Sequence, residues 1–206
     1  LVTEVDALHI AEMVRSSLVS EFGQAAYTDG YRVYTSVDST HQVAANQALR
    51  HGLLAYDRRH GYRGPATNLD TARLVDSPYV AAALANANAP APLIPAVVLN
   101  VAPDAVSLAL ADAKKVVLGP GSWRWTKKSI DAVVSPGDLI YVIHGSDGLL
   151  LAQLPDIDGA LVSLNPHDGA VLALVGGFDF ARNKLNHVTQ ALRQPGSNIK
   201  PFIYSA

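Results

Sequence analysis

Short β-rich runs follow one another between residues 96 and 155, and they limit the choice of fold more than any other part of the sequence. The runs are AVVLNV, AVSLALAD, KKVVLG, DLIYVIHG and GLLLAQLP, and the turns are APDA, GPGS, SPGD and GSDG. Turns rich in Gly, Pro, Asp and Ser between such runs predict successive short strands. Five short strands in about 60 residues are typical of a small β-barrel of the OB type. Such barrels often bind oligonucleotides or oligosaccharides, although the fold alone does not give a function.

Composition narrows the class of protein further. The chain has 206 residues, of which 49% are hydrophobic and 17% charged, so it is globular and long enough for one large or two small domains. The net charge of -2 argues against a nucleic-acid partner. Without cysteine there is no disulfide and no thiol nucleophile. The seven histidines contain no H-x-x-x-H pair, so we expect no metal and no cofactor.

The residues before the β-rich part predict helices and one strand. Apolar spacing predicts an amphipathic helix over 4–22, and alternation in GYRVYTSVD predicts a strand over 31–37. A second helix is expected over about 39–57, capped by Asp38 or Ser39, and a short one over about 70–87. The apolar residues expected to be buried in the first two helices are Ala7, Ala11, Val14, Leu18, Phe22, Ala45, Leu49, Leu53 and Tyr56.

After the barrel, GALVSLNPHDGAVLALVGG predicts a β-hairpin. Two apolar runs flank Asp168-Gly169, which is a strong turn signal. Because both runs are almost continuously apolar, we expect a strand pair that is buried on both faces. With the helices, this predicts an α+β fold in which a mixed sheet is covered by helices.

Two features suggest binding, and each has a structural alternative. The stretch YDRRHGYRGP, residues 56–65, is the basic cluster of the chain. It is expected to be a solvated loop held by local ion pairs, and the alternative is a contact for an anionic ligand or a neighbouring domain. Trp123 and Trp125 are expected to cover the barrel or face a neighbour, and the alternative is that they stack on a ligand.

The candidate catalytic residues are Ser197 and Lys200, in the stretch RQPGSNIKPFIYSA. A serine hydroxyl needs a base to act as a nucleophile, and residues at i and i+3 share one face of a helix. Pro201 is tolerated only in the first turn, so the helix is expected to begin near Ser197. Phe202 and Ile203 are expected to enter a core, where a buried lysine has a lowered pKa and can act as a base. The S-x-x-K spacing alone is weak, since about one is expected by chance in a chain of this length.

The longer string is more specific. RQPGSNIKPFIY, together with DGAVLALVGG upstream, resembles the start of the transpeptidase domain of penicillin-binding proteins. YRVYTSVDSTHQVAANQAL also resembles the strand and the Gln-containing helix that open that domain. The roughly 100 residues between that helix and the hairpin, with their OB-like part, resemble the insertion in bifunctional class A enzymes of the Gram-negative 1a type. The resemblance divides the chain into a linker with the first strand and helix (1–65), an OB-like insertion (66–156) and a transpeptidase start (157–206).

The resemblance implies a serine acyl transfer. Ser197 matches the nucleophile, whose backbone N–H forms half of the oxyanion hole, and Lys200 matches the general base. The implied activity is that of a D-Ala-D-Ala transpeptidase or carboxypeptidase, which acts on peptidoglycan stem peptides ending in D-Ala-D-Ala and is acylated by β-lactams. The parent enzyme is also expected to polymerise glycan strands and to be anchored at the periplasmic face of the inner membrane. A protein activator at the OB-like insertion is a further expected partner.

The family's other motifs, S-x-N and K-T-G, are expected downstream of Ala206 rather than within this chain. The glycan-polymerising domain is expected before Leu1. We therefore expect a middle segment of a longer enzyme, inactive alone, because removing even one oxyanion donor costs about 3 to 4 kcal/mol of transition-state stabilisation. The alternative is a binding module whose OB-like part docks a protein partner or a glycan.

Overall fold

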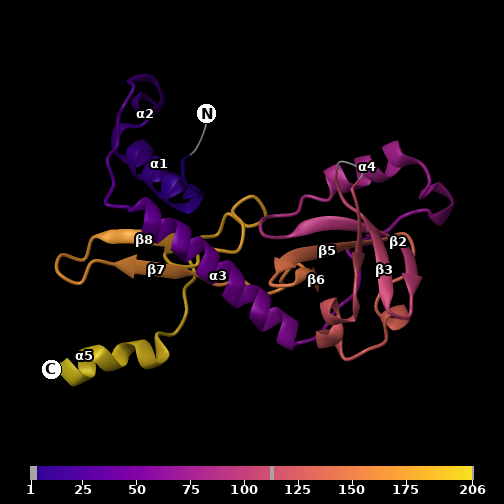
Figure 1. Cartoon of the computed structure of the whole chain (residues 1–206). Coiled ribbons are helices and arrows are strands. Elements are labelled where there is room, and N and C mark those ends of the chain that lie inside the picture. The colour runs from indigo at the N-terminus through magenta and orange to yellow at the C-terminus, as the bar shows by residue number, and fades with distance from the viewer. Residues whose placement is uncertain (1–3, 112–113, 206) are drawn as a thin grey trace. The chain divides into compact units, whose positions relative to one another are not determined.

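Contacts divide the chain into two units. The computed structural model describes residues 4–111 and 114–205. One unit comprises Leu1–Leu49 with Asp158–Ala206, and the other comprises Arg50–Ile157 (Figure 1). The second unit is thus continuous in sequence, whereas the first is assembled from segments on either side of it.

An antiparallel sheet forms the centre of residues 50–157. Its order is β4-β3-β2-β5, and β1 and β6 pair with successive parts of the remaining edge of β5. All five predicted runs form strands, as their β-rich composition and the turn residues between them indicated. The described strands β4 and β6 do not pair with each other, so hydrogen bonds do not close the sheet into the expected barrel. The strands are β1 (Thr67–Asn68), β2 (Ile94–Ala102), β3 (Ala105–Ala109), β4 (Lys115–Leu118), β5 (Asp138–Gly145) and β6 (Gly148–Ala152).

The larger buried cluster of this unit lies on one face of the sheet. Alternate residues of β2, β3 and β5 point inward, and Val98, Leu108 and Ile140 are almost completely buried. Trp123 belongs to the same buried cluster, and the indole Nε1 of Trp125 donates a hydrogen bond to the Leu151 carbonyl oxygen at 3.1 Å. The expectation that the two tryptophans are structural is confirmed. Three 3₁₀ turns around them are η3 (Pro120–Ser122), η4 (Arg124–Thr126) and η5 (Ile130–Ala132).

The helix predicted over 70–87 is interrupted. Asp70 caps a 3₁₀ turn, η1 (Thr71–Arg73), and Asp76 caps a separate helix, α4 (Ser77–Asn86). The Asp76 carboxylate accepts a hydrogen bond from the Tyr79 N–H, which lowers the pKa of Asp76. Each of the two segments therefore begins at its own aspartate cap. Val80 and Leu84 of α4 pack on the second face of the sheet.

The other unit contains four α-helices, one 3₁₀ turn and one hairpin among the described residues. The helices are α1 (Leu8–Phe22), α2 (Ala25–Thr28), α3 (Ser39–Arg59) and α5 (Lys200–Ser205), and the 3₁₀ turn is η6 (Gly196–Ile199). The hairpin consists of β7 (Leu161–Leu164) and β8 (Val171–Val175). The predicted second helix is confirmed as α3, whose last residues belong to the other unit. Its cap is Asp38, which accepts a hydrogen bond from the His41 N–H at 2.9 Å; this bond lowers the pKa of Asp38.

Two predictions near the N-terminus are wrong. Residues 31–37 form no strand; the Ser36 hydroxyl donates to the Val171 carbonyl, and the Asp38 N–H donates to the Leu172 carbonyl, beside β8. The helix α1 forms, but its one buried residue is His9, and Ala11 is exposed. Apolar spacing therefore misidentified the buried face of α1, because the side chain that fills it is polar.

The hairpin forms as predicted, with its turn at residues 165–169. Gly169 has φ +74°, a conformation that glycine adopts without strain. The end of β8 is buried, and Ala173 and Val175 pack against Ala45 of α3. Burial on both faces is wrong for β7, because Val162 and Leu164 are exposed. Those two positions have no covering layer among the described residues.

Gln42 joins α3 to the hairpin. Its side chain is 1% exposed. The amide oxygen accepts from the Leu174 N–H at 2.9 Å, and the amide nitrogen donates to the Leu174 carbonyl at 3.0 Å. On the next turn of α3, Asn46 donates to the Asp6 carbonyl at 2.7 Å. Gln42 thus satisfies both backbone groups of Leu174, 132 residues away in the sequence.

Replacing Gln42 by leucine is expected to destabilise the unit of residues 4–49 and 158–205. The change leaves the Leu174 N–H and C=O buried without partners, at a cost of about 3 kcal/mol. Thermal unfolding followed by circular dichroism measures the effect. The matched control is Gln47→Leu, an exposed position on the same helix, which should change stability little. Equal stability of the two variants would contradict this role of Gln42.

Candidate functional site

Ser197 and Lys200 lie within one turn of a continuous helical segment. The 3₁₀ turn Gly196–Ile199 leads directly into α5, which starts at Lys200. Gly196 has φ +52° and supplies the sharp entry expected before Ser197. Pro201 is the second residue of α5, where the missing N–H costs nothing. The helix therefore begins where the sequence predicted, with the serine at its start.

The surroundings of this helix differ from the expectation. α5 has no buried residue, Phe202 is 72% exposed, and Ser197 and Lys200 are exposed as well. The prediction that Phe202 and Ile203 enter a core is wrong for the described part of the chain, because no described residue covers them there. Burial of the lysine therefore has no support within this chain.

One S-x-N string does occur, contrary to the expectation that this motif lies outside the chain. It is Ser163-Leu164-Asn165, at the end of β7. Asn165 closes the hairpin turn, since its N–H donates to the Ala170 carbonyl and its side-chain oxygen accepts from the His167 N–H. The asparagine of this string is therefore part of the hairpin turn, and its serine lies in β7.

His187, ten residues before Ser197, is also held structurally. Its backbone N–H and its Nδ1 both bond to the Gly176 carbonyl oxygen, at 3.0 and 2.7 Å. These bonds therefore give no support to a Ser-His-Asp arrangement with Ser197. In the ranges 4–111 and 114–205, no group of His, Asp and Glu is arranged to hold a metal ion.

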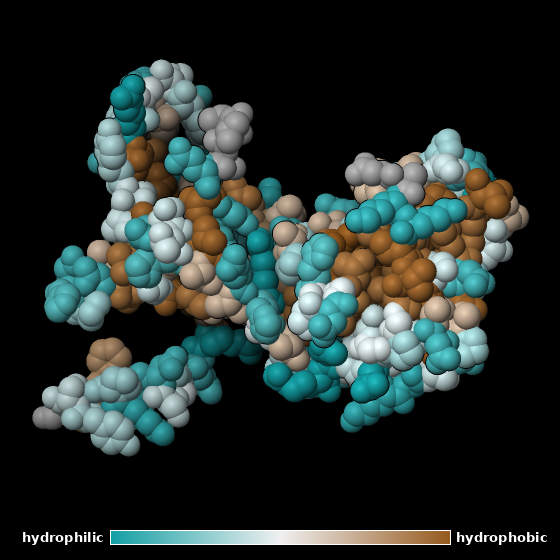
Figure 2. Space-filling model, viewed as in Figure 1, coloured by the Kyte–Doolittle hydropathy of each residue, from teal (hydrophilic) through white to brown (hydrophobic). Residues whose placement is uncertain are grey.

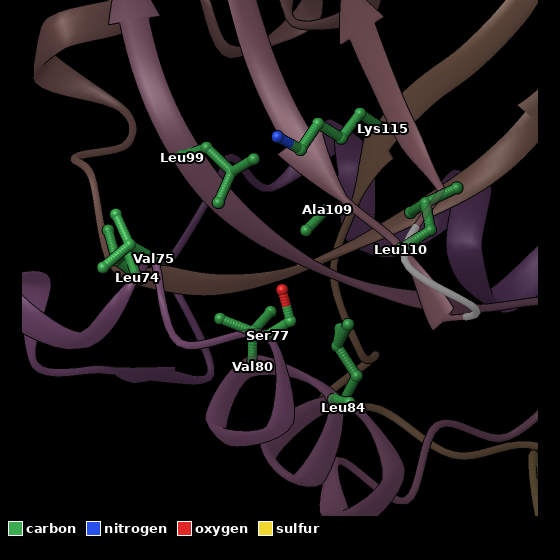
Figure 3. A pocket seen from close by; sticks show the side chains of 10 residues that line it. Leu74, Val75, Ser77, Val80, Leu84, Leu99, Ala109, Leu110 and Lys115 are labelled. Carbon is green, nitrogen blue, oxygen red and sulfur yellow. The ribbon is translucent and has the colours of Figure 1, made fainter.

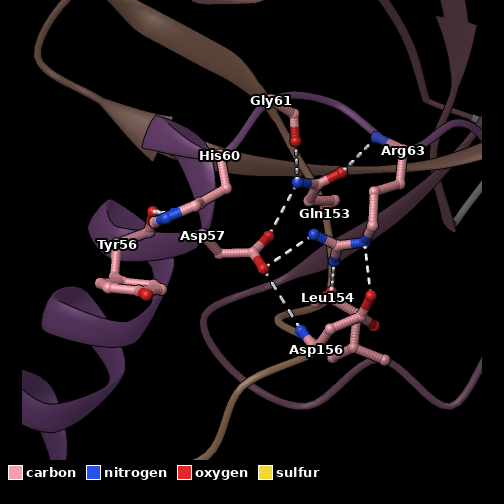
Figure 4. A network of polar contacts seen from close by, with 8 residues as sticks. All are labelled: Tyr56, Asp57, His60, Gly61, Arg63, Gln153, Leu154 and Asp156. Atoms are coloured by element: carbon pink, nitrogen blue, oxygen red, sulfur yellow. Dashed lines mark hydrogen bonds and ion pairs between the residues drawn. The ribbon is translucent and has the colours of Figure 1, made fainter.

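The basic stretch 56–65 belongs to a polar network around Asp57 (Figure 4). Asp57 is buried and accepts hydrogen bonds from Arg63 at 2.8 Å and from the Gln153 amide at 2.7 Å. Arg63 also pairs with Asp156 at 2.8 Å, and Gln153 accepts from the Arg63 N–H at 2.9 Å. The network ties the end of α3 to the segment after β6.

The local-ion-pair interpretation of this stretch is confirmed for Arg63. Arg58 lies over the Trp125 ring at 5.4 Å, and Arg59 lies over the Tyr56 ring at 5.6 Å, so both guanidinium groups also have aromatic partners. The contact of Arg58 leaves Trp125 engaged by the protein itself. Its ring is therefore a poor candidate for stacking on a ligand.

A second candidate site is an apolar groove between α4 and the strands β2, β3 and β4. Hydrophobic residues gather on the β2 and β3 side of this unit (Figure 2). The groove has a volume of about 400 Å³. Only two of its lining residues are polar, Ser77 and Lys115, and the Lys115 ammonium extends over it toward Leu99 (Figure 3). Val75, at its rim, is 92% exposed.

Comparison with known proteins identifies the family. A family model described as the penicillin-binding protein OB-like domain matches residues 62–157. Penicillin-binding protein 1A of Escherichia coli (strain K12) is 42% identical over 97% of this chain, and that of Pseudomonas aeruginosa is 40% identical over 98%. The chain belongs to the penicillin-binding protein family. The crystal structure of penicillin-binding protein 1A from Haemophilus influenzae matches it with a TM-score of 0.89 and 38% identity over its whole length.

The match to penicillin-binding proteins confirms the resemblance and the α+β fold with an OB-like part. The chain spans about a quarter of the length of its E. coli relative and 31% of the matched H. influenzae chain. No described helix is both long and apolar enough to cross a membrane. Sequence reasoning missed Gln42, Asp57 and Gln153, since nothing local marks a polar residue as buried.

Replacing Asp57 by alanine is expected to destabilise the OB-like unit of this penicillin-binding protein by about 3 kcal/mol. The change leaves the buried Gln153 amide without its carboxylate partner and removes one partner of Arg63. Urea unfolding followed by tryptophan fluorescence measures the loss. Asp104→Ala, at an exposed turn, is the control and should unfold like the unmodified chain. An unchanged midpoint for Asp57→Ala would show that the network contributes nothing to stability.

Proposed function

We propose that this chain is the part of a peptidoglycan-synthesising enzyme that carries the acylated serine of its transpeptidase site. The observation that supports this most is the S-x-x-K match at Ser197 and Lys200, within a chain 42% identical to a penicillin-binding protein 1A. Ser197 is the only serine in the sequence followed by a lysine three residues later. Its place in the first helical turn supports the assignment, because backbone N–H groups there are free to stabilise an oxyanion.

The proposed reaction is a two-step acyl transfer. Lys200 accepts the Ser197 proton as the hydroxyl oxygen attacks the carbonyl carbon between two D-alanines. The peptide bond breaks, the terminal D-alanine leaves as the protonated amine, and an acyl-serine remains. An amine of a second stem peptide then displaces the serine and forms the cross-link. β-Lactams acylate the same oxygen, and glycan polymerisation belongs to other parts of the proposed enzyme, which acts at the periplasmic face of the inner membrane.

The exposed α5 supports the proposal that the site is completed outside this chain. Phe202 and Ile203 present an uncovered apolar surface directly after the S-x-x-K turn. In a family member, the strand that carries K-T-G would form the opposite wall of the cleft and supply the second oxyanion donor. We therefore expect the chain alone to react with β-lactams very slowly or not at all.

Intact-mass measurement after incubation with benzylpenicillin tests the proposal. The chain extended at both ends to the length of its relatives should gain one drug mass, and the 206-residue chain should gain none. After tryptic digestion, the adduct should lie on the peptide that begins at Gln194, because trypsin cleaves after Arg193. That peptide should continue past Lys200, because the Lys200–Pro201 bond resists cleavage. Ser197→Ala should abolish the adduct, and Lys200→Ala should slow its formation by about 10²-fold or more.

Ser205→Ala is the matched control, because Ser205 lies on the same helical segment, eight residues after Ser197. It should be acylated normally. A folded, extended Ser197→Ala protein that still gains the drug mass would show that another residue is the nucleophile. Failure of the extended protein itself to react would overturn the acyl-transfer proposal.

A second proposed function is the docking of a protein partner in the groove of the OB-like unit. The groove supports this because it is lined mainly by apolar side chains and because its rim residue Val75 is almost fully exposed. Lys115 adds a positive charge, so an apolar segment that carries a carboxylate is the partner chemistry that fits. A protein activator of the synthase would use the groove in this way.

Site-specific photocrosslinking in cells tests the docking proposal. A benzophenone amino acid at Val75 should give one discrete protein adduct, and the adduct should weaken when Lys115 is changed to glutamate. Placing the probe at Leu192, a position of similar exposure in the other unit, is the control. No adduct at position 75, or the same adduct at both positions, would contradict a docking site in the groove.

A further inference from the structure

A buried imidazole lies where α1 meets the loop that follows β8. His9 is 6% exposed, although it belongs to a helix whose other described residues are partly or fully exposed. Its ring contacts Phe180 edge-on, with centroids 5.0 Å apart. A Cβ built at Gly176 would lie 2.6 Å from the His9 Cδ2 atom, so only glycine leaves room for the ring. The ring is therefore closely enclosed by the loop of residues 176–187, called here the post-β8 loop.

The Nε2 atom of His9 is buried and has no hydrogen-bond partner among the described residues. A neutral imidazole tolerates this, because one of its two nitrogens carries no proton. A protonated imidazole does not, because both nitrogens then carry a proton that needs an acceptor. The enclosure is thus suited to one protonation state of His9. In agreement, burial lowers the pKa of His9 below its ordinary 6.5.

The charged groups that face His9 come from three other segments. Asp158 and Asp179 raise its pKa, as does Asp6 just before α1, and His187 lowers it. Asp158 is already engaged, because it accepts hydrogen bonds from the Phe178 N–H at 2.7 Å and from the Asn183 side chain at 3.2 Å. These carboxylates only partly offset burial, since the net shift of the pKa is downward.

The post-β8 loop also holds α1 at a second point. The Asn186 amide donates to the sulfur of Met13 at 3.2 Å, one turn of helix after His9. Within the loop, the N–H and the Nδ1 of His187 both bond to the Gly176 carbonyl oxygen, so the two ends of the loop are linked. Two α1 side chains therefore contact the loop, and one of them can gain a charge near neutral pH.

We propose that His9 is a pH-sensitive clasp, in which the neutral ring holds α1 on the post-β8 loop and protonation of the ring releases α1. The direction of the pH dependence follows from the linkage between proton binding by His9 and the docking of α1 on the post-β8 loop. Released His9 binds a proton more readily than enclosed His9, so docking is strongest above pH 6.5 and weakens as the pH falls below it. The post-β8 loop ends ten residues before Ser197, but the clasp requires no acyl-transfer activity.

NMR of Met13 provides a direct readout, because Met13 is the only methionine of the chain. The carbon-13-labelled Met13 methyl group should give one signal at about pH 8 that shifts or broadens in a one-proton transition toward about pH 5. The midpoint should lie below 6.5, and the His9 ring signal should titrate with the same midpoint. Amide hydrogen exchange in α1 should accelerate over the same range, while α4 stays unchanged.

Three variants test whether His9, rather than another histidine, causes the Met13 transition. His9→Phe keeps an aromatic ring without a proton and should abolish the Met13 transition. His187→Gln and His41→Gln should retain it, the second because His41 is exposed and pairs with Asp38. A transition that persists in His9→Phe, or that disappears in His187→Gln alone, would overturn the proposal. If His9→Phe fails to fold, the ring signal of His9 decides, since a Met13 transition without His9 titration also overturns it.

Discussion

The rest of this structure depends on the hydrogen bonds made by polar side chains on the buried face of α3. Gln42 satisfies the N–H and C=O of Leu174, and Asn46 on the next turn binds the carbonyl of Asp6. Near the end of the helix, Asp57 is the acceptor at the centre of the Arg63 and Gln153 network. A buried polar group needs a hydrogen-bond partner. These contacts therefore specify one register of α3 against each segment that packs on it. Apolar contacts alone would permit several.

Local signals explain why most elements were predictable from the sequence. The strands of the OB-like unit are rich in β-forming residues and are separated by turn residues, so neighbouring residues contain the information needed to place them. The helix α3 has its own cap at Asp38. By contrast, the buried face of α1 was not predictable, since it is filled by His9, which occurs on surfaces and in cores alike. Phe202 and Ile203 show the opposite error, because apolar residues adjoining a catalytic motif suggest a core that the described residues do not provide.

The candidate site was recognisable from the sequence for a different reason. Ser197 and Lys200 are close in the chain, and the string around them is specific enough to indicate a family. Leu174 lies 132 residues from Gln42, and Gln153 lies 96 residues from Asp57, so no local pattern could identify these two contacts. Long-range polar contacts are fixed by the folded topology, and the topology follows from many weak preferences acting together. Residues that carry chemistry within one turn are therefore easier to predict than residues that hold the fold.

The positions of the two tryptophans make indole emission specific to one of the two units. Trp123 and Trp125 both lie in the OB-like unit, where the first is in the core and the second bonds to Leu151. Intrinsic indole emission therefore reports only on residues 50–157. The remaining unit contains tyrosine and phenylalanine but no indole, and its unfolding is invisible at the same wavelengths. A single sample can thus show whether the two units melt together or in sequence, by comparing indole emission with helical ellipticity.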